Sequence, residues 1–248
     1  MTEPQPAGHR LLRLVEVMDT LRRECPWDRG QTHESLAKYL IQEAYETLET
    51  IEEGDVAQLR EELGDVLLQV VFHAAIAAER PGDDPARFTV DDVADAIIDK
   101  MTRRHPHVFG GAQVSGTDEV WSNWEAIKAA ERAEKARAGG GTGETSVLDG
   151  VPFAQPAVLL AYELQKRAVR NGLPAELVGD DGGAGGGLFA AVAAERDRDR
   201  DAETDLRAAA RRFDGRVRAA EAAARADGRE PRGLSAAQWR AYWEAAGG

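Results

Sequence analysis

Hydrophobic residues recur along most of the chain at the three- and four-residue spacing that is typical of amphipathic helices. Strict alternation of apolar and polar residues, which is typical of strands, is scarce. Ala, Glu, Leu and Arg are frequent, and all four are good helix formers. His9 to Arg23 carries a broad apolar stripe that ends before Pro26, so we expect a helix there and a loop over Cys25 to Gly30. The pattern predicts an all-α fold.

Proline, glycine and capping residues divide the following segment into further helices. The predicted ranges are Thr32 or His33 to about Ile51, Val56 to Glu79, Val90 to about Arg104, and Asp118 to Arg137. Gly54 and Asp55 break the chain between the first two, and Thr89 is placed to cap the third. Together with the first helix, these ranges predict one compact unit over residues 9–137.

The composition changes after residue 137. Gly139 to Gly143 is a glycine run with Thr and Ser beside it, which predicts a flexible linker over 138–147. A helix is expected from Ala157 to Arg170, followed by a glycine-rich low-complexity stretch from Gly179 to Gly187. The tail after it, to Gly248, is rich in Ala and Arg and mostly helical in pattern. We expect a second, looser helical region over 148–248.

Charge and composition exclude several functions. The 248 residues carry a formal net charge of -13, which disfavours nucleic-acid binding. No run approaches the roughly 20 apolar residues of a membrane span, and the N-terminus lacks the apolar stretch of a secretory signal. We therefore expect a cytoplasmic protein without a membrane partner. Cys25 is the only cysteine, which excludes an internal disulfide and a thiolate metal cluster.

Four carboxylates on two successive helices form the most informative polar pattern. Glu43 and Glu46 are three residues apart on one predicted helix, and Glu62 and Asp65 are three apart on the next. This spacing puts each pair on one helix face, and antiparallel helices joined near Gly54 bring the pairs together. Four converging carboxylates cannot all stay ionised in a dry site without a cation. Oxygen ligands of this kind select Mg²⁺, Mn²⁺ or Ca²⁺.

Solvated helix charges, or a structural ion pair with Lys100, are the alternative explanation of this spacing. The surrounding pattern favours a metal site, because Glu43 lies within the apolar stripe of its helix. The next helix is apolar over most of its circumference, so we expect burial nearly all round. Its polar residues form one narrow lane: Glu62, Asp65, Gln69 and His73. A di-iron site is disfavoured because neither carboxylate pair is a Glu-x-x-His motif.

The order of motifs over about Leu11 to Lys135 resembles the MazG-type nucleotide pyrophosphohydrolase domain. The matching stretches are Cys25-Pro26-Trp27-Asp28 with Gln31-Thr32-His33, Glu43-Ala44-Tyr45-Glu46 with Glu62-Leu63-Gly64-Asp65, Asp99-Lys100 leading into Arg103-Arg104-His105-Pro106-His107-Val108-Phe109, and Trp124-Glu125-Ala126-Ile127-Lys128. The resemblance covers about half of the chain. It implies an all-α helical bundle that assembles as a homodimer or homotetramer.

The resemblance also implies an activity, the Mg²⁺-dependent hydrolysis of nucleoside triphosphates, both NTP and dNTP, at the bond between the α- and β-phosphates. The products are a nucleoside monophosphate and pyrophosphate, and the role is house-cleaning of the nucleotide pool. The family's metal ligands correspond to Glu43, Glu46, Glu62 and Asp65, and Mn²⁺ is a possible substitute for Mg²⁺. Glu43 or Glu46 is the candidate to position or deprotonate the attacking water.

Basic and aromatic residues supply candidates for substrate binding. Lys100 and Arg104, one helical turn apart, are placed to bind phosphates, and Arg103 is a weaker candidate. A solvated basic helix end, stabilised by the helix dipole, explains them equally well. Trp124 and Lys128 are candidates to complete the pocket, although a tryptophan is more often part of a core or an interface. Trp27 either stacks on the base or anchors its own loop.

The region after the linker resembles a degenerate second copy of the same domain. The similar segments are Val147 to Gly172, Leu188 to Val192, Ala209 to Arg218 with its Arg211-Arg212-Phe213, and Gln238-Trp239 with Trp243. The paired acidic motifs have no counterpart between Leu173 and Leu188. We therefore expect a second repeat that lacks metal ligands.

Two other functions remain open at this point. One is a narrower pyrophosphatase of the same superfamily, acting on dCTP, dUTP or phosphoribosyl-ATP. The other is a non-catalytic helical regulator that binds a nucleotide or a protein partner.

Overall fold

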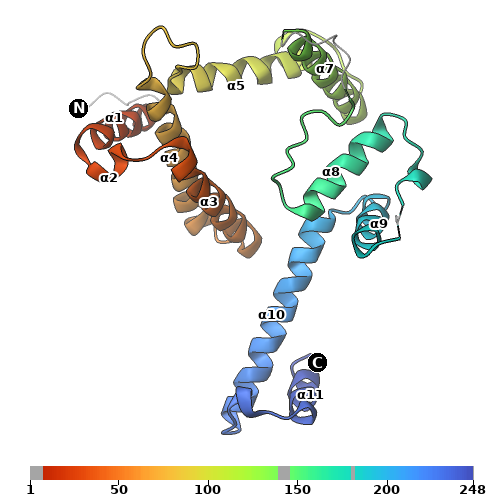
Figure 1. The fold of residues 1–248 in the computed structure, drawn as a ribbon. Coiled ribbons are helices and arrows are strands. Elements are labelled where there is room, and N and C mark those ends of the chain that lie inside the picture. Colours follow the sequence, from red (N-terminus) through yellow and green to blue (C-terminus); the bar gives the residue numbers. More distant parts are fainter. Residues whose placement is uncertain (1–7, 139–145, 180–181, 248) are drawn as a thin grey trace. The chain divides into compact units, whose positions relative to one another are not determined.

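Helices are the regular secondary structure of the part of the chain that the structure describes. The computed structural model describes residues 8–138, 146–179 and 182–247, and these contain helices and no strand (Figure 1). The predicted all-α fold is confirmed. The predicted glycine linker lies mostly outside the described residues. No helix in the described ranges is long and apolar enough to cross a membrane.

The structure divides into two compact units, Met1–Ile127 and Lys128–Gly248. The first unit contains α1 (His9–Glu24), α2 (Pro26–Arg29), α3 (His33–Glu53), α4 (Val56–Ala78), α5 (Val90–Arg104), α6 (Pro106–Phe109) and the start of α7 (Thr117–Ala138). The second contains the rest of α7, then α8 (Ala157–Arg170), η1 (Ala175–Leu177), α9 (Ala184–Arg196), α10 (Ala202–Ala226), η2 (Pro231–Gly233) and α11 (Ala236–Ala245).

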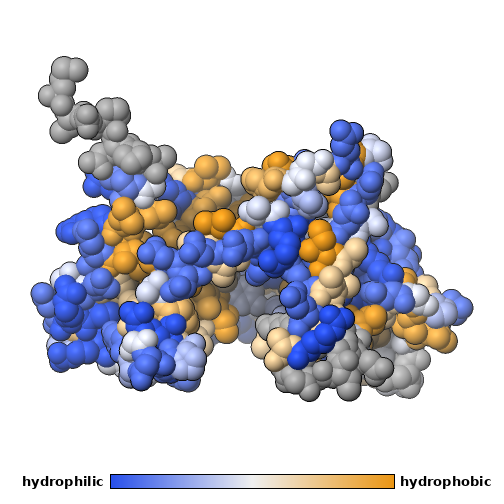
Figure 2. Space-filling view, turned by 90° about the horizontal axis from the view of Figure 1, so that it is seen from above, coloured by the Kyte–Doolittle hydropathy of each residue, from blue (hydrophilic) through white to orange (hydrophobic). Residues whose placement is uncertain are grey.

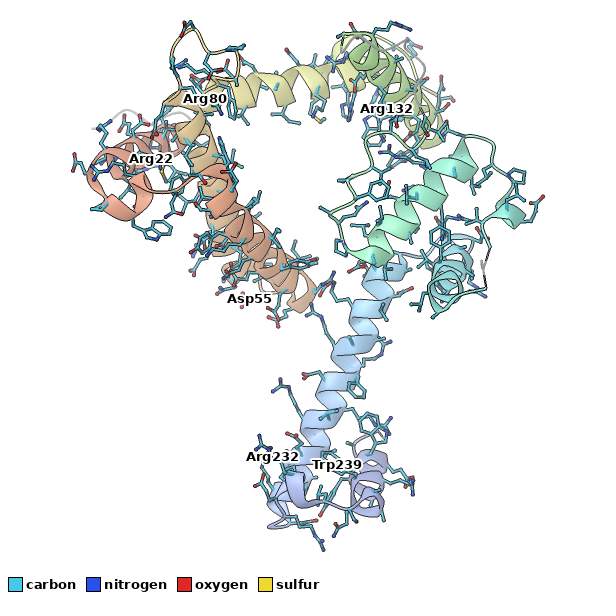
Figure 3. All side chains as sticks on the ribbon, viewed as in Figure 1. Arg22, Asp55, Arg80, Arg132, Arg232 and Trp239 are labelled. Atoms are coloured by element: carbon cyan, nitrogen blue, oxygen red, sulfur yellow. The ribbon has the colours of Figure 1, made fainter. Side chains whose placement is uncertain are left out.

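The turn between α3 and α4 determines how these two helices pack. Gly54 ends α3 with φ 75°, a left-handed conformation that glycine adopts without strain. Asp55 then caps α4, because its side chain accepts hydrogen bonds from the backbone N–H groups of Ala57 and Gln58. Figure 3 places Asp55 at this turn. The short turn folds α3 back along α4, and the two helices pack along their length.

The core of the first unit lies where α1, α3 and α4 meet. Met18, Leu36, Val71 and Phe72 form its buried cluster. The expected burial of α4 nearly all round is wrong for the single chain. Its C-terminal half is covered, but Leu63 is 51% exposed and Val70 is 38% exposed. The core-forming helices reach one side of α4 only, so its other side remains open.

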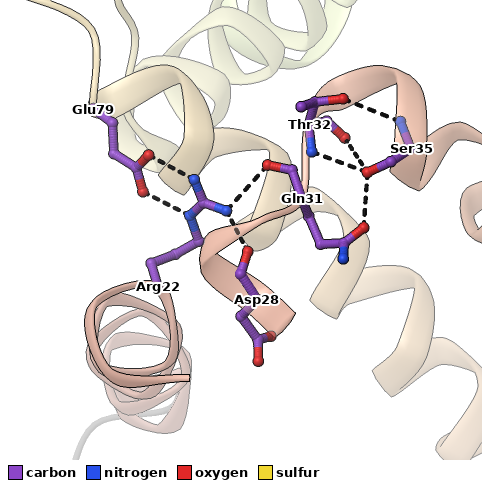
Figure 4. Close-up of polar contacts among 6 residues, drawn as sticks. All are labelled: Arg22, Asp28, Gln31, Thr32, Ser35 and Glu79. Carbon is purple, nitrogen blue, oxygen red and sulfur yellow. Dashed lines mark hydrogen bonds and ion pairs between the residues drawn. The ribbon is translucent and has the colours of Figure 1, made fainter. Parts of the chain in front are cut away.

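An arginine fastens the start of the chain to the end of α4. Arg22 is buried, and its guanidinium makes a bidentate ion pair with Glu79 in which both N···O distances are 2.6 Å (Figure 4). The same guanidinium donates to the carbonyl oxygens of Asp28 and Gln31. One side chain thereby joins α1, the segment around α2, and α4.

The segment from Cys25 to Gly30 was expected to be a loop, and this expectation is wrong for its middle. Pro26–Arg29 forms one helical turn, α2. Proline is favourable at the first position of a helix, because its fixed φ suits the helix and its missing N–H would have no helical partner there. The turn is too short to give a periodic signal in the sequence.

In the second unit, α8 packs against α9 and α10. Gln165 of α8 is buried and donates from Nε2 to the backbone oxygen of Phe189 in α9 at 2.7 Å. The glycine-rich stretch predicted before Leu188 is partly helical, since α9 begins at Ala184 and takes in three glycines. Burial of Val192 and Ala193 on the same helix offsets the low helix propensity of glycine.

Candidate metal and nucleotide site

Three carboxylates converge between α3 and α4. Glu43 comes from α3, and Glu62 and Asp65 come from α4. Each offers an oxygen, and these oxygens all lie within 4.8 Å of one another. We call these three residues the acidic cluster. Glu43 and Glu62 are half-buried, while Asp65 is exposed. The turn at Gly54 brings Glu43 close to Glu62 and Asp65, which come from the next helix.

Glu46 lies beside the acidic cluster but outside it. One of its carboxylate oxygens accepts a hydrogen bond from Gln42 Nε2 at 3.0 Å. Burial raises the pKa of Glu43, and a hydrogen bond with Glu46 and the negative charges of Glu46, Asp65 and Glu62 raise it further. Burial and the neighbouring negative charges both disfavour the ionised form of Glu43, and a bound cation would favour it.

The donor set fits a hard divalent cation. The cluster offers only carboxylate oxygens, which Mg²⁺, Mn²⁺ and Ca²⁺ prefer over nitrogen and sulfur ligands. Oxygens around one Mg²⁺ lie at 2.0–2.1 Å from the ion, so opposite ligands are about 4 Å apart. The cluster oxygens lie within 4.8 Å of one another, and small side-chain rotations would bring them to these separations. Histidine and cysteine are absent from the cluster, which disfavours zinc and iron.

Beyond the acidic cluster, the polar face of α4 continues to His73, which contacts His33 at the start of α3. His73 and His33 stack with ring centroids 5.1 Å apart, and their Nδ1 atoms are 2.8 Å apart. One ring therefore donates its Nδ1–H to the Nδ1 of the other. Burial, and then the charge of His33, lower the pKa of His73. Helix periodicity does not predict that these residues, 40 positions apart, meet.

A pocket of about 330 Å³ lies between the end of α5 and the start of α7. We call this cavity the tryptophan pocket. Its lining residues are Met101, Arg104, His105, Val120, Trp121 and Trp124. The guanidinium carbon of Arg104 lies 5.7 Å from the ring centre of Trp124, within the range of a cation–π contact. The structure therefore brings together two residues that the sequence selected for substrate binding.

Trp121 is a pocket residue that the sequence analysis missed. Its ring packs edge-on against Trp124, with centroids 5.3 Å apart. The spacing of three residues on one predicted helix was the available signal, because residues three apart share a helix face. His105 is fixed in the pocket wall by donating from Nδ1 to the backbone oxygen of Met101 at 2.7 Å.

The remaining candidates lie outside the lining of this pocket. Lys100 and Arg103 are exposed on α5. Lys128 follows Trp124 by one turn of α7 and is the first residue of the second unit. Trp27 packs edge-on against Tyr39 and Phe72, with ring centroids 6.2 and 6.5 Å away. These contacts are those of an anchor that holds α2 on the core, although half of the ring remains exposed.

Comparison with known proteins gives the family. A model of the MazG nucleotide pyrophosphohydrolase domain matches residues 31–109. A nucleoside triphosphate pyrophosphohydrolase of Mycolicibacterium smegmatis is 42% identical over 98% of this chain and 72% of its own. The nucleoside triphosphate pyrophosphohydrolase/pyrophosphatase MazG of Thermotoga maritima is 37% identical over 98% of this chain and 97% of its own. The chain belongs to the MazG family. A nucleoside triphosphate pyrophosphohydrolase of Escherichia coli is 42% identical over 64% of this chain and 57% of its own.

The MazG match covers most of the site described above. Residues 31–109 contain the acidic cluster, Glu46 and Arg104, whereas Trp27, Trp124 and Lys128 lie outside this range. The two relatives that align over 98% of this chain extend the similarity through the second unit. Family membership therefore applies to the whole chain and not to the carboxylate helices alone.

Proposed function

We propose that this chain hydrolyses nucleoside triphosphates, NTP and dNTP, at the α–β phosphate bond. Water adds across the P–O–P bridge, and the products are a nucleoside monophosphate and pyrophosphate. The observation that carries the proposal is the acidic cluster on α3 and α4 in a MazG-family chain. The relatives named above carry this activity in their names. The role we propose is the removal of surplus or non-standard triphosphates in the cytoplasm.

We assign Mg²⁺ to the acidic cluster, held by Glu43, Glu62 and Asp65. Mn²⁺ fits the same oxygen ligands. When bound, the ion neutralises phosphate charge and lowers the pKa of water. This is needed because a chain of net charge -13 otherwise repels a triphosphate.

Glu46 is the carboxylate we assign as the proton acceptor for the attacking water. It lies one turn after Glu43 but outside the three mutually close oxygens. Gln42 donates a hydrogen bond to one of its oxygens, and an ionised carboxylate in this position can accept a proton from water. A carboxylate bound tightly to a cation is a weaker base, so a neighbour outside the cluster suits this role better.

Arg104 and Lys100 are the residues we assign to the phosphates, with Arg103 as a further cation on the same helix. Charge-assisted hydrogen bonds from arginine to phosphate are strong and directional. Trp124 orients Arg104 through the cation–π contact, and Lys128, one turn after Trp124 on α7, is a further candidate cation. For Trp27 we propose a structural role, which is to anchor α2 to the core.

The proposed assembly is a homodimer or homotetramer. Large apolar side chains on α3 and α4 are exposed in the single chain, and hydrophobic residues gather in patches at the surface (Figure 2). On these two helices they are Leu40, Ile41, Tyr45, Ile51, Val56, Leu63 and Val70. A second copy covering this face would bury them, and burial of apolar surface is the main driving force of association.

Pyrophosphate release from a panel of NTPs and dNTPs with Mg²⁺ tests the activity. Asp65→Asn tests the metal ligand, and Glu46→Gln tests the proton acceptor. Glu61→Gln is the matched control, because Glu61 is exposed on α4 and its nearest partner is Arg60 at 3.9 Å. We expect turnover by the wild type and by Glu61→Gln, and its loss in the other two.

Measurements of metal binding distinguish a metal ligand from a proton acceptor. Glu46→Gln should keep the affinity for Mn²⁺ in calorimetry, and Asp65→Asn should lose it. Equal loss of Mn²⁺ affinity in both would make Glu46 a ligand instead of a base. Absence of turnover by folded, metal-loaded wild type on every triphosphate would reject the hydrolase and favour a nucleotide-binding regulator.

A further inference from the structure

The second unit contains an open cleft between α10 and α11. We call it the arginine cleft, and its volume is about 510 Å³. Its lining residues are Arg212, Phe213, Gly215, Arg216, Trp243, Ala246 and Gly247. The lining has two arginines and no carboxylate, although the chain as a whole is strongly acidic. A cleft of this composition attracts anions locally against the overall field.

The two arginines have different tasks. Arg216 donates from Nε and Nη2 to the backbone oxygen of Trp243, at 3.0 and 2.8 Å, and its guanidinium carbon lies 4.3 Å from the centre of that ring. Arg216 therefore holds α11 against α10. Arg212, one turn earlier on the same face of α10, is exposed and has no hydrogen-bond or ion-pair partner in the described ranges. Its donors remain available to a ligand.

The cleft also offers aromatic surface. The ring of Phe213 is 62% exposed and lies 5.6 Å from the ring of Trp243, tilted by 54°. An exposed ring beside a cation with unused donors suits a ligand that has both a planar group and a negative charge. A carboxylate cluster that could hold a metal ion is absent from the described part of this unit.

The arginine cleft repeats the contact that forms the tryptophan pocket of the first unit. There, Arg104 of α5 lies over Trp124 of α7, with a second aromatic ring three residues away along one of the helices. Here, Arg216 of α10 lies over Trp243 of α11, and Phe213 is three residues before Arg216. The second unit therefore has an arginine–tryptophan contact of the same kind, and its described part has no counterpart of the acidic cluster.

We propose that the arginine cleft is a second nucleotide site, one that binds a nucleoside phosphate without cleaving it. Arg212 binds the phosphates, and the exposed ring of Phe213 stacks on the base. Arg216 keeps its structural bonds to Trp243 and adds positive charge at the cleft wall. No bond in the ligand is broken, because the described part of this unit has no cluster of carboxylates that could hold an ion and activate water.

Binding without divalent cations tests this site. The probe is α,β-methylene-ATP, chosen because the proposed substrate is a triphosphate, with calorimetry in EDTA on the full chain carrying Arg104→Gln. That substitution and the chelator remove binding at the first unit. We expect one molecule bound per chain with a Kd below about 1 mM. Absence of binding would overturn the proposal.

Three further substitutions, each added to that chain, locate the ligand. Arg212→Gln should weaken binding about tenfold or more, the effect of losing a charge-assisted hydrogen bond. Arg218→Gln is the matched control, because Arg218 is exposed on the same helix, pairs with Asp214 at 2.7 Å and lies outside the cleft lining. Equal effects of the two arginine substitutions would overturn the proposal.

Phe213→Ala distinguishes a nucleotide from phosphate alone. It should weaken binding of the nucleotide analogue and leave binding of inorganic pyrophosphate unchanged. If pyrophosphate binds as tightly as the analogue, the ligand class proposed here is wrong. All of these readouts are binding measurements in EDTA, so they do not depend on whether the first unit hydrolyses triphosphates.

Discussion

The two units share an arginine that lies over a tryptophan and differ in their carboxylates. Arg104 with Trp124 in the first unit and Arg216 with Trp243 in the second make the same type of cation–π contact. The described residues contain one acidic cluster able to hold a metal ion, and it lies in the first unit. If both proposals hold, the difference shows that nucleotide binding and phosphate hydrolysis depend on separate groups, and that a unit without the acidic cluster can still bind a nucleotide.

The largest effect should come from breaking the acidic cluster. Asp65→Asn removes a charge with little change of shape, and we expect turnover to fall at least about 100-fold, because even residues that only support metal ligands cost 10–100-fold. Nucleotide binding in the second unit, measured in EDTA, should stay as it was. Turnover close to that of the wild type would remove the cluster from the mechanism.

Next in size is a stability effect confined to the first unit. Arg22→Ala removes a buried guanidinium and leaves the oxygens of Asp28 and Gln31 without it. We expect a loss of about 2 kcal/mol, less than for a fully buried pair because Glu79 is half-exposed. Arg13→Ala, which breaks an exposed pair with Glu16, should cost below about 0.5 kcal/mol.

Hydrogen exchange measures this loss in each unit separately. Protection should fall in α1 to α4 and stay constant in α8 to α11, because the two units are compact on their own. A uniform fall over the whole chain would show that the units do not open independently.

The arginine of the first unit gives a smaller, kinetic effect. Arg104→Gln should lower kcat/KM by about tenfold or more through the loss of a charge-assisted hydrogen bond to phosphate. Arg218→Gln, an equal change of charge outside both pockets, should leave kcat/KM as it is. An unchanged kcat/KM in Arg104→Gln would show that the tryptophan pocket does not bind the substrate.

The smallest effect is the pH dependence that comes from the histidine pair. The folded pKa of His73 is below its ordinary value of 6.5, so the unfolded chain binds more protons in this range. The stability of the first unit should therefore fall as the pH is lowered through 6.5 toward the folded pKa. His73→Phe should flatten this slope. The second unit has no histidine, so its hydrogen exchange, corrected for the intrinsic rate, provides the internal control.

Much of the first unit follows from local signals in the sequence. Thr89 as a cap and Pro106 as a stop predicted the helix Val90–Arg104 with the bounds it has. Gly54 likewise marked the turn that brings the carboxylates together. These signals act within a few residues, so a single sequence is enough to show them.

Contacts between distant residues did not follow from the sequence. Arg22 and Glu79 are 57 positions apart, and His33 and His73 are 40 apart. Periodicity gives the face on which a side chain lies but not its partner on another helix. The open side of α4 escaped prediction for the same reason, since an apolar residue is patterned alike whether its own chain or a second copy covers it.

The products formed from a triphosphate are the most direct test of the central claim. Phosphorus NMR of the wild type with Mg²⁺ and the best triphosphate of the panel should show nucleoside monophosphate and pyrophosphate in equal amounts, and neither product with Asp65→Asn. Nucleoside diphosphate with inorganic phosphate, or unchanged triphosphate in the presence of folded, metal-loaded wild type, would contradict it.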